Sequence, residues 1–391
     1  MRIPILGALP CLLMAQAPPL SYDDILQRAR TSPEQLRTEA LLARRHQALA
    51  GTRGLLREGP ALGVSAGPRT HPGSPSTTDQ SVELDLPLFL APGTRRRLEA
   101  SLGHADPLLR EAARIEARMR LRQAYLDAWL AERLLQLREA DLATVQAWLR
   151  AAQARLEAGA DPGFQVSLVE GEVLRAQADL DEAHRQRLNV WAGLRALAEV
   201  PARPVPLADP GSPQALEGQG LQAQFEAGAL RRALQGHLDL EQQASRHQEA
   251  LATSRWSLRG SYGREGEERI GKVGLAYRFS RPGEARAVQR EIGAALQATR
   301  REQEAALLEL DARFQSAWSR LQTAAPPLPF AGFELSLNAI SLRLREGKER
   351  PSEALPIRRQ LLEAQASSHR RLHAAHLLSA ELQALISGVT P

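Results

Sequence analysis

Cysteine is almost absent from this sequence of 391 residues, and aromatic residues make up only 4% of it. The one cysteine, Cys11, lies in an apolar segment close to the N-terminus. The remainder of the chain therefore uses neither disulfide bonds nor thiol chemistry. Beyond that segment no apolar run reaches about 18 residues, which excludes a transmembrane helix. An exported chain of this kind crosses a bilayer only through β-strands that close into a barrel.

Signatures of catalysis and of nucleic-acid binding are also missing. The sequence contains no His-Glu-x-x-His pair for zinc and no glycine-rich phosphate loop. Its net charge is +5, but arginine and glutamate are interspersed, and no basic block carries interleaved aromatic residues. Recognition of nucleic acid usually leaves such a block. We therefore expect no enzymatic activity, no cofactor and no nucleic-acid partner.

The first seventeen residues have the pattern of a secretory signal peptide. A short basic start, Met1-Arg2, precedes an apolar run from Ile3 to Met14, and small residues extend from there as far as Ala17. Pro18 disfavours cleavage directly after Ala17, so the cleavage site stays open. Pro10 stands where a lipid-anchored protein has a small residue before its cysteine, which disfavours lipid attachment. We predict an exported chain.

Long helices dominate the rest of the chain. Ala, Leu, Glu, Arg and Gln prevail, a composition typical of coiled coils. Helical periodicity continues from Thr94 to Ala158, about 60 residues or roughly 90 Å, which exceeds what an ordinary globular core accommodates. Glycine and proline at Gly159 to Gly163 predict a tight reversal. A return helix from Phe164 to Ala198 completes a coiled-coil hairpin.

Two segments alternate with period two instead. Leu62 and Val64 alternate with glycine and serine, and after a proline-rich turn the alternation resumes at Val82. Each strand is about ten residues long with one apolar face, as in a transmembrane β-strand. The pattern alone fits a pair of half-buried hairpins in a soluble domain equally well. We predict β-hairpins at residues 61–89 and 255–279.

The two halves of the chain repeat each other. Arg155-Leu156-Glu157-Ala158-Gly159 corresponds to Leu344-Arg345-Glu346-Gly347, and Tyr125 returns as Phe314 at nearly the same offset. An internal repeat of this kind decides the architecture before any single residue does. The chain therefore consists of two copies of one structural plan.

The repeat sets the domain boundaries. Residues 18–200 form the first repeat and residues 214–391 the second, joined by a proline-rich linker at residues 201–213. Each repeat contains a helix, a β-hairpin and a long helical hairpin, the last placed at residues 94–198 and 283–387.

The helix before each hairpin has its own boundaries. Ser32-Pro33 is a good N-cap followed by proline at the first helical position, and this helix extends to about Arg57. Its counterpart covers about Gln214 to Ala252. Four residues, Pro326 to Pro329, predict a break in the second long arm.

Strand number makes oligomerisation necessary if the hairpins enter a membrane. Four strands cannot close a barrel, and open sheet edges are not viable in lipid. Two copies would give eight strands, whose interior side chains nearly fill. Three copies would give twelve strands and leave a lumen, so a polar-lined pore is easier to build as a trimer.

This order of elements resembles the TolC-type outer-membrane efflux channels, in particular the shorter members of heavy-metal and multidrug efflux systems. Its most specific motifs are Arg155 to Gly159 with Leu174 to Ala178, Gln123 to Asp127, and Leu86 to Phe89 before Pro92-Gly93. The resemblance implies an α+β membrane protein, mostly α, whose four strands contribute to a trimeric 12-stranded outer-membrane β-barrel. It also implies a periplasmic adaptor (membrane fusion) protein, an inner-membrane pump reached through the adaptor, and outer-membrane lipid as partners of a homotrimer.

The resemblance assigns roles to the two helical tips as well. The family usually has an acidic residue six positions after the tip glycine, but this chain has Gln165 and Glu353, which argues against a symmetric charged ring. The candidate adaptor-contacting residues are Gly159, Asp161, Phe164, Gly347 and Arg350. Carboxylates at a narrow ring act strongly on passing ions, so the candidates for the constricted entrance are Asp161, Glu349 and Glu353.

Three histidines near the C-terminus share one helical face. His369, His373 and His376 have the spacing i, i+4, i+7, which places them together. Imidazoles so arranged are able to bind a borderline metal, but Arg370 and Arg371 would repel a cation. We assign no metal and keep the three histidines as weak candidates.

Two functions remain open. The first is an outer-membrane exit duct of a tripartite efflux or type I secretion system, which conducts substrates passively. The second is a secreted periplasmic structural or adaptor coiled-coil protein without a pore. The hairpins separate the two, because only a duct places them in lipid.

Overall fold

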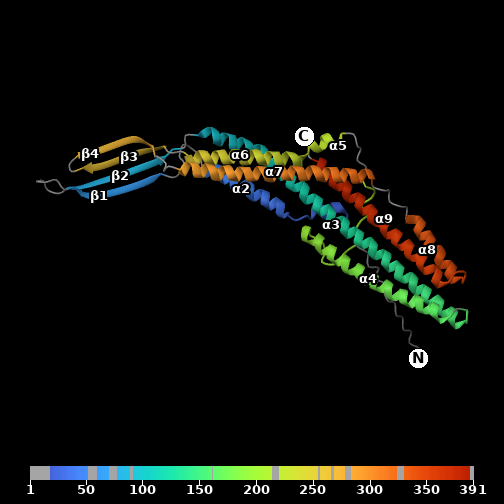
Figure 1. The fold of residues 1–391 in the computed structure, drawn as a ribbon. Helices are drawn as coiled ribbons and strands as arrows, with labels where there is room; N and C mark the ends of the chain where they lie inside the picture. Colours follow the sequence, from blue (N-terminus) through green and yellow to red (C-terminus); the bar gives the residue numbers. More distant parts are fainter. Residues whose placement is uncertain are drawn as a thin grey trace, which may run out of the picture. The chain divides into compact units, whose positions relative to one another are not determined.

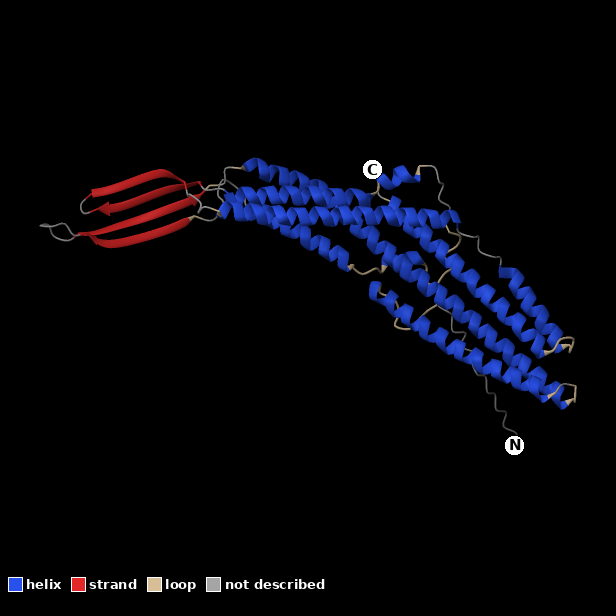
Figure 2. Cartoon of the chain, in the orientation of Figure 1, coloured by secondary structure: helices blue, strands red, loops and turns tan. Residues whose placement is uncertain are grey.

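A computed structural model describes most of the chain, and the signal peptide predicted at residues 1–17 lies outside the described residues. The described ranges are 18–51, 60–69, 77–88, 91–160, 162–213, 220–253, 256–265, 268–277, 283–323 and 330–387. Long helices and one four-stranded sheet make up these ranges (Figure 2). The chain divides into two compact units, and each unit combines segments from both halves of the sequence.

The elements occur in the duplicated order that the sequence predicts (Figure 1). In chain order they are α1 (Tyr22–Gln27), α2 (Pro33–Gly51), β1 (Ala61–Arg69), β2 (Thr77–Pro87), α3 (Pro92–Glu157), α4 (Gly163–Leu197), α5 (Leu221–Glu226), α6 (Ala229–Thr253), β3 (Trp256–Glu265), β4 (Glu268–Tyr277), α7 (Glu284–Thr323), α8 (Phe330–Arg345) and α9 (Pro351–Ile386). The short helix α1 is an addition, because six residues are too few to produce a recognisable period.

The helix predicted from 214 to 252 is wrong as a single element. Its part from residue 220 onward consists of α5 and α6, which are interrupted at Gly228, and residues 214–219 lie outside the described residues. A Cβ on Gly228 would lie 2.6 Å from the carbonyl oxygen of Leu385 and 2.9 Å from that of Phe225. Only glycine permits so close an approach between backbones. The interruption therefore reflects packing against the C-terminal end of α9.

The first repeat matches its predicted helix boundaries closely. Ser32 Oγ accepts a hydrogen bond from the Gln35 amide at 3.2 Å, and Gln35 Oε1 accepts one from the Ser32 amide at 2.8 Å. This capping box starts α2 as predicted. α2 is described as far as Gly51, so the predicted extension to Arg57 lies outside the described residues.

The long arms are confirmed. α3 has 66 residues, which corresponds to about 99 Å, and it continues through Pro107. In the second repeat, one helix ends at Thr323 and the next begins at Phe330, on either side of the predicted break. α3 with α7 and α8, and α4 with α9, are thus the corresponding arms of the two repeats.

The sheet is antiparallel throughout, in the order β1-β2-β3-β4. Its register aligns apolar side chains in rows across the four strands, for example Leu62, Leu84 and Val273 in one row. Leu62 is 68% exposed and Val273 82% exposed, so these side chains form a surface and not a core. The other face is polar and includes Glu83, Lys272 and an ion pair between Asp85 and Arg259 at 3.2 Å. The alternation predicted from the sequence is confirmed.

Each unit has hydrophobic clusters of its own. In the first unit, Trp148 of α3 packs with Val169 of α4 and Ala354 of α9. In the second unit, Leu42 of α2 packs with Leu102 of α3 and Leu240 of α6. Helix-to-helix seams of this kind replace a single globular core, because each long helix buries only a stripe.

Candidate functional site

Two helical hairpins of the first unit end in equivalent tips. Gly159 has φ = +70° and Gly347 has φ = +71°. Each ends its helix with a hydrogen bond from its own amide, to the carbonyl oxygen of Leu156 at 2.9 Å and of Leu344 at 3.1 Å. Glycine adopts this left-handed conformation without strain. The repeat found in the sequence therefore extends to the backbone geometry of the tips.

Side chains link the two tips to each other. Gln165 Nε2 donates to Ser352 Oγ at 3.3 Å, and the Ser352 amide donates to Gln165 Oε1 at 3.2 Å. Arg155 Nη1 lies 3.5 Å from the carbonyl oxygens of both Leu344 and Glu349. Gln165, which replaces the acidic residue usual in the family, is 2% exposed. It joins the start of α4 to the start of α9.

The other predicted tip residues that the structure describes are more exposed than Gln165. Phe164 is 59% exposed, and Gly159, Gly347, Arg350 and Glu353 are exposed too, so the hairpin ends offer these residues to a partner.

The entrance candidates do not share one environment. The Glu349 side chain is only 15% exposed, with Oε2 at 3.8 Å from Arg343 Nε. Glu353 is exposed, and Asp161 lies outside the described residues.

A buried cluster of four charged residues was not anticipated from the sequence. Arg358 of α9 is 1% exposed and contacts both Asp141 of α3 and Glu172 of α4, the latter at 3.0 Å. Arg359 Nε lies 3.1 Å from both carboxylate oxygens of Glu172. The Arg358 guanidinium also lies 5.8 Å from the ring centre of Trp148. Three helices from two hairpins therefore meet at one ion-paired cluster.

The charges in this cluster balance. Burial favours a raised pKa for Glu172, but the hydrogen bonds from Arg359 and Arg358 outweigh it and lower the pKa. Burial raises the pKa of Asp141, and Arg358 opposes that rise. Two carboxylates and two guanidinium groups pair with each other here, and Arg358, Asp141 and Glu172 are buried, so removal of Arg358 leaves buried charge uncompensated.

The three histidines of α9 contact α3, two of them through the same tryptophan and the third through a carboxylate. His369 and His376 pack edge-on against Trp129, with ring centres at 6.4 and 6.3 Å. His373 Nε2 lies 2.8 Å from Asp127 Oδ1. Among the residues that the structure describes, no three His, Cys, Asp or Glu side chains are placed to hold a metal.

The two histidines beside Trp129 predict that the stability of the first unit depends on pH. Burial lowers the pKa of both, helped by Arg133 at His369 and by Arg122 at His376. The unfolded chain therefore binds more protons than the folded chain as pH falls below about 6.5. We expect the thermal midpoint of the first unit to hold above about pH 7 and to fall toward about pH 5.

Substitution isolates this contribution. His369→Gln combined with His376→Gln should flatten the melting curve's pH dependence, measured by circular dichroism, whereas exposed His184→Gln should leave it unchanged. Equal pH profiles for wild type and double variant would contradict the assignment.

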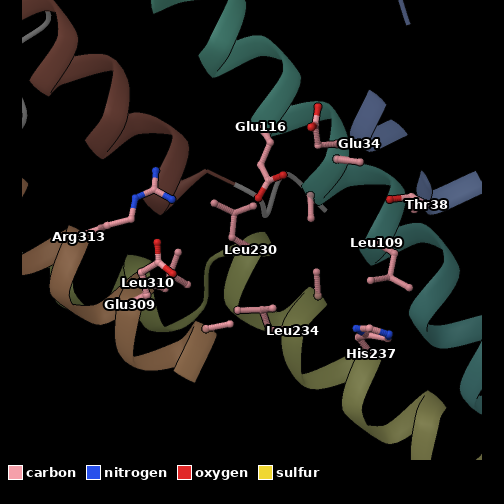
Figure 3. A pocket seen from close by; sticks show the side chains of 14 residues that line it. Glu34, Thr38, Leu109, Glu116, Leu230, Leu234, His237, Glu309, Leu310 and Arg313 are labelled. Atoms are coloured by element: carbon pink, nitrogen blue, oxygen red, sulfur yellow. The ribbon is translucent and has the colours of Figure 1, made fainter. Parts of the chain in front are cut away.

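Two clefts lie in the seams between helices. One, of about 300 Å³, lies in the second unit among α2, α3, α6 and α7 (Figure 3). Leu and Ala side chains line this cleft, together with charged side chains that include Glu116 and Arg313. Arg313 Nε lies 3.4 Å from Glu381 Oε1. The other, of about 590 Å³, lies in the first unit beside Trp129 and Arg358.

Gly63-Val64-Ser65-Ala66-Gly67 has the spacing of a hydrolase nucleophile turn, but it lies within β1. The turn in hydrolases is a sharp strand-to-helix connection that exposes serine. Here Ser65 is paired in register with Ser81, and their hydroxyl oxygens are 2.7 Å apart. This serine belongs to the polar face of the sheet.

Comparison with known proteins agrees with this geometry. Residues 28–198 match the family model described as Outer membrane efflux protein. A similar fold, extending over 94% of this chain, recurs in solved outer-membrane channels. The first repeat therefore matches the outer membrane efflux protein family. No curated protein sequence matches the chain significantly.

Three solved structures have a fold similar to that of this chain over nearly its whole length. CusC has a TM-score of 0.69 at 14% identity, covering 94% of this chain and 91% of CusC. MtrE of Neisseria gonorrhoeae has a TM-score of 0.69 at 16% identity, covering 94% and 88%. VceC of Vibrio cholerae has a TM-score of 0.66 at 15% identity, covering 94% and 95%. No helix among the described residues has both the length and the hydropathy that spanning a bilayer requires.

Substitution of the tip glycines should lower the stability of the fold. Gly347→Ala places a Cβ at φ = +71°, which costs about 1–2 kcal/mol. Gly171→Ala, in the interior of α4 where a Cβ meets nothing within 4 Å, should instead stabilise by about 0.5–1 kcal/mol. Thermal melting followed by circular dichroism measures both, and an unchanged midpoint for Gly347→Ala would contradict the assigned backbone role.

Proposed function

We propose that this chain is the outer-membrane exit duct of a tripartite efflux system, passively conducting substrates to the cell exterior. The match of residues 28–198 to the outer membrane efflux protein family supports an outer-membrane location with the long helices in the periplasm. CusC is described as forming a transmembrane channel, and MtrE was solved in an open state as an outer membrane channel. These relatives support the assignment of a conducting role.

The single observation that carries the proposal is the exposed apolar face of the sheet. Nine large apolar side chains on the four strands are 38–82% exposed, namely Leu62, Val64, Val82, Leu84, Trp256, Tyr262, Val273, Leu275 and Tyr277. The register gathers them on one face. Such a surface is unfavourable in water and suits lipid contact, with the polar face toward an aqueous lumen.

Oligomerisation follows from the sheet. β1 and β4 are edge strands, and lipid tolerates no open edge. Three copies supply twelve strands, so we infer a homotrimer in which β4 of one protomer pairs with β1 of the next. A soluble coiled-coil protein without a pore has no use for a continuous apolar face, which disfavours that alternative.

The exposed tips fit contact with a periplasmic adaptor. Phe164 and Arg350 protrude at the two hairpin ends and are available to a partner. Through the adaptor the duct would connect to an inner-membrane pump, which supplies the energy. We assign the duct itself no catalytic step.

Purification of the full chain from outer membranes tests the duct. We expect a heat-modifiable trimer that requires detergent and forms discrete conductance steps in planar bilayers. A soluble monomer would refute the proposal.

Adaptor contact is tested at the tips. Phe164→Asp should weaken cross-linking to the adaptor by at least roughly five-fold, since an apolar contact is replaced by a charge. Trimer formation should persist. The control is Leu188→Asp, an equally exposed apolar position of α4 away from the tip. Equal loss of cross-linking in both variants would show that the tip is not the contact.

A further inference from the structure

Arginine is concentrated where the helices of the second unit meet the sheet. We consider the eight residues of α2, α3, α6 and α7 nearest the strands, which are 44–51, 92–99, 246–253 and 284–291. They contain eight arginines and four acidic residues, an excess of +4 in a chain whose total is +5. The four acidic residues are Glu99, Glu249, Glu284 and Glu291. The junction therefore carries a net charge of +4 in a chain whose charges otherwise nearly balance.

Six of the eight arginine side chains are exposed and form no ion pair within the described residues. Arg45 contacts Glu241, and Arg95 lies 2.6 Å from Glu99. The remaining six are exposed, and none of them forms an ion pair within the described part of the chain. We call these six the arginine collar: Arg44, Arg96, Arg97, Arg246, Arg286 and Arg290. Unpaired guanidinium groups are matched to phosphate, which they bind with two parallel hydrogen bonds.

An aromatic pair lies between the collar and the apolar face. Trp256 is the first residue of β3 and Tyr277 the last of β4, and they are register partners. Their ring centres are 5.1 Å apart, and they are 40% and 46% exposed. Trp and Tyr concentrate at membrane–water interfaces. From the strands toward the helices, the order is thus apolar surface, interfacial aromatics, then unpaired arginine.

We propose that the arginine collar binds the headgroups of anionic phospholipids in the leaflet that faces the helices. The inference rests on the proposed outer-membrane function, because only a sheet in lipid brings the collar to headgroup level. Basic residues beside an anionic leaflet strengthen membrane association by roughly five-fold each. The collar would therefore fix the depth of the sheet in the membrane and recruit anionic lipid around it.

Trp256 provides a local reporter of the surrounding lipid. It is the only one of the five tryptophans that lies in the sheet. The full-length trimer is reconstituted in mixtures of phosphatidylcholine and phosphatidylglycerol in which one or the other lipid is brominated. The quenching that is lost in Trp256→Phe gives the relative affinity of the two lipids for the surface around Trp256. We expect wild type to prefer phosphatidylglycerol several-fold, and about 0.5 M salt to weaken this preference by screening.

The collar variant carries Arg96→Gln, Arg97→Gln, Arg286→Gln and Arg290→Gln, and its preference should fall to near unity. The control is Arg300→Gln with Arg301→Gln, two consecutive exposed arginines of α7 about 24 Å from its start, which should keep the wild-type ratio.

The outcomes distinguish a failure of the collar proposal from a failure of the proposed function. Absence of quenching by either brominated lipid would show that the sheet is not in a bilayer and would sink the proposed function. Quenching without preference in wild type would overturn the collar alone. So would a collar variant that keeps its lipid preference and changes only the anion-to-cation permeability ratio, since the arginines would then line the lumen.

Discussion

Arg358→Met is expected to destabilise the first unit by about 3–5 kcal/mol, because it leaves Asp141 and Glu172 as buried carboxylates with fewer partners. Methionine keeps much of the side-chain volume and removes the charge. Urea unfolding followed by circular dichroism should show the loss. Conductance of the trimer should change with it, since the cluster joins α3 and α4 to α9.

Two controls separate charge from packing at this cluster. Arg359→Gln removes a guanidinium that is 49% exposed and should cost at most about 1 kcal/mol. Adding Asp141→Leu to Arg358→Met should recover part of the lost stability, since the lone carboxylate is gone. If Arg358→Met is no more harmful than Arg359→Gln, the cluster does not hold the hairpins together.

Val273→Lys should prevent stable insertion of the sheet. Val273 is 82% exposed on the apolar face, and a lysine near the middle of the bilayer costs about 2–4 kcal/mol in each chain. The three chains of the proposed trimer each contribute this cost. We expect little or no heat-modifiable trimer in outer-membrane fractions.

Ser261→Lys is the matched control. Ser261 lies on the polar face, between Glu83 and Lys272 in the register, so its lysine would meet water and a carboxylate. This variant should assemble like wild type and shift only ion selectivity. Equal assembly of both variants would show that the apolar face does not meet lipid.

The predictable parts of this fold are those encoded locally. Period-two alternation marks the strands around Leu62 and Val273, and glycine at 159 and 347 marks the tips, because positive φ demands it. The capping box at Ser32 fixes a helix start through contacts three residues apart. α1 is missed because its order depends on ring packing, Tyr22 against Tyr125.

The candidate site is predicted less completely than the fold. The chain has 50 basic and 45 acidic side chains, and no local pattern distinguishes Arg358 from the solvated majority. Its burial depends on Asp141 and Glu172, which are 217 and 186 residues away along the chain. Gln165 similarly reads as a lost charge, until its hydrogen bonds to Ser352 show it as a link between hairpins.

The sequence by itself determined the duplication, the long arms, the tips and the two-faced strands, because backbone preference and periodicity act within a few residues. Only the tertiary structure decided which charges are buried, which histidine partners which ring, and that the apolar rows of four strands form one surface. These depend on register and on helix-to-helix contact, which bring together residues 170 to 246 positions apart. Pairing over such distances is a property of the folded chain and leaves no local signal.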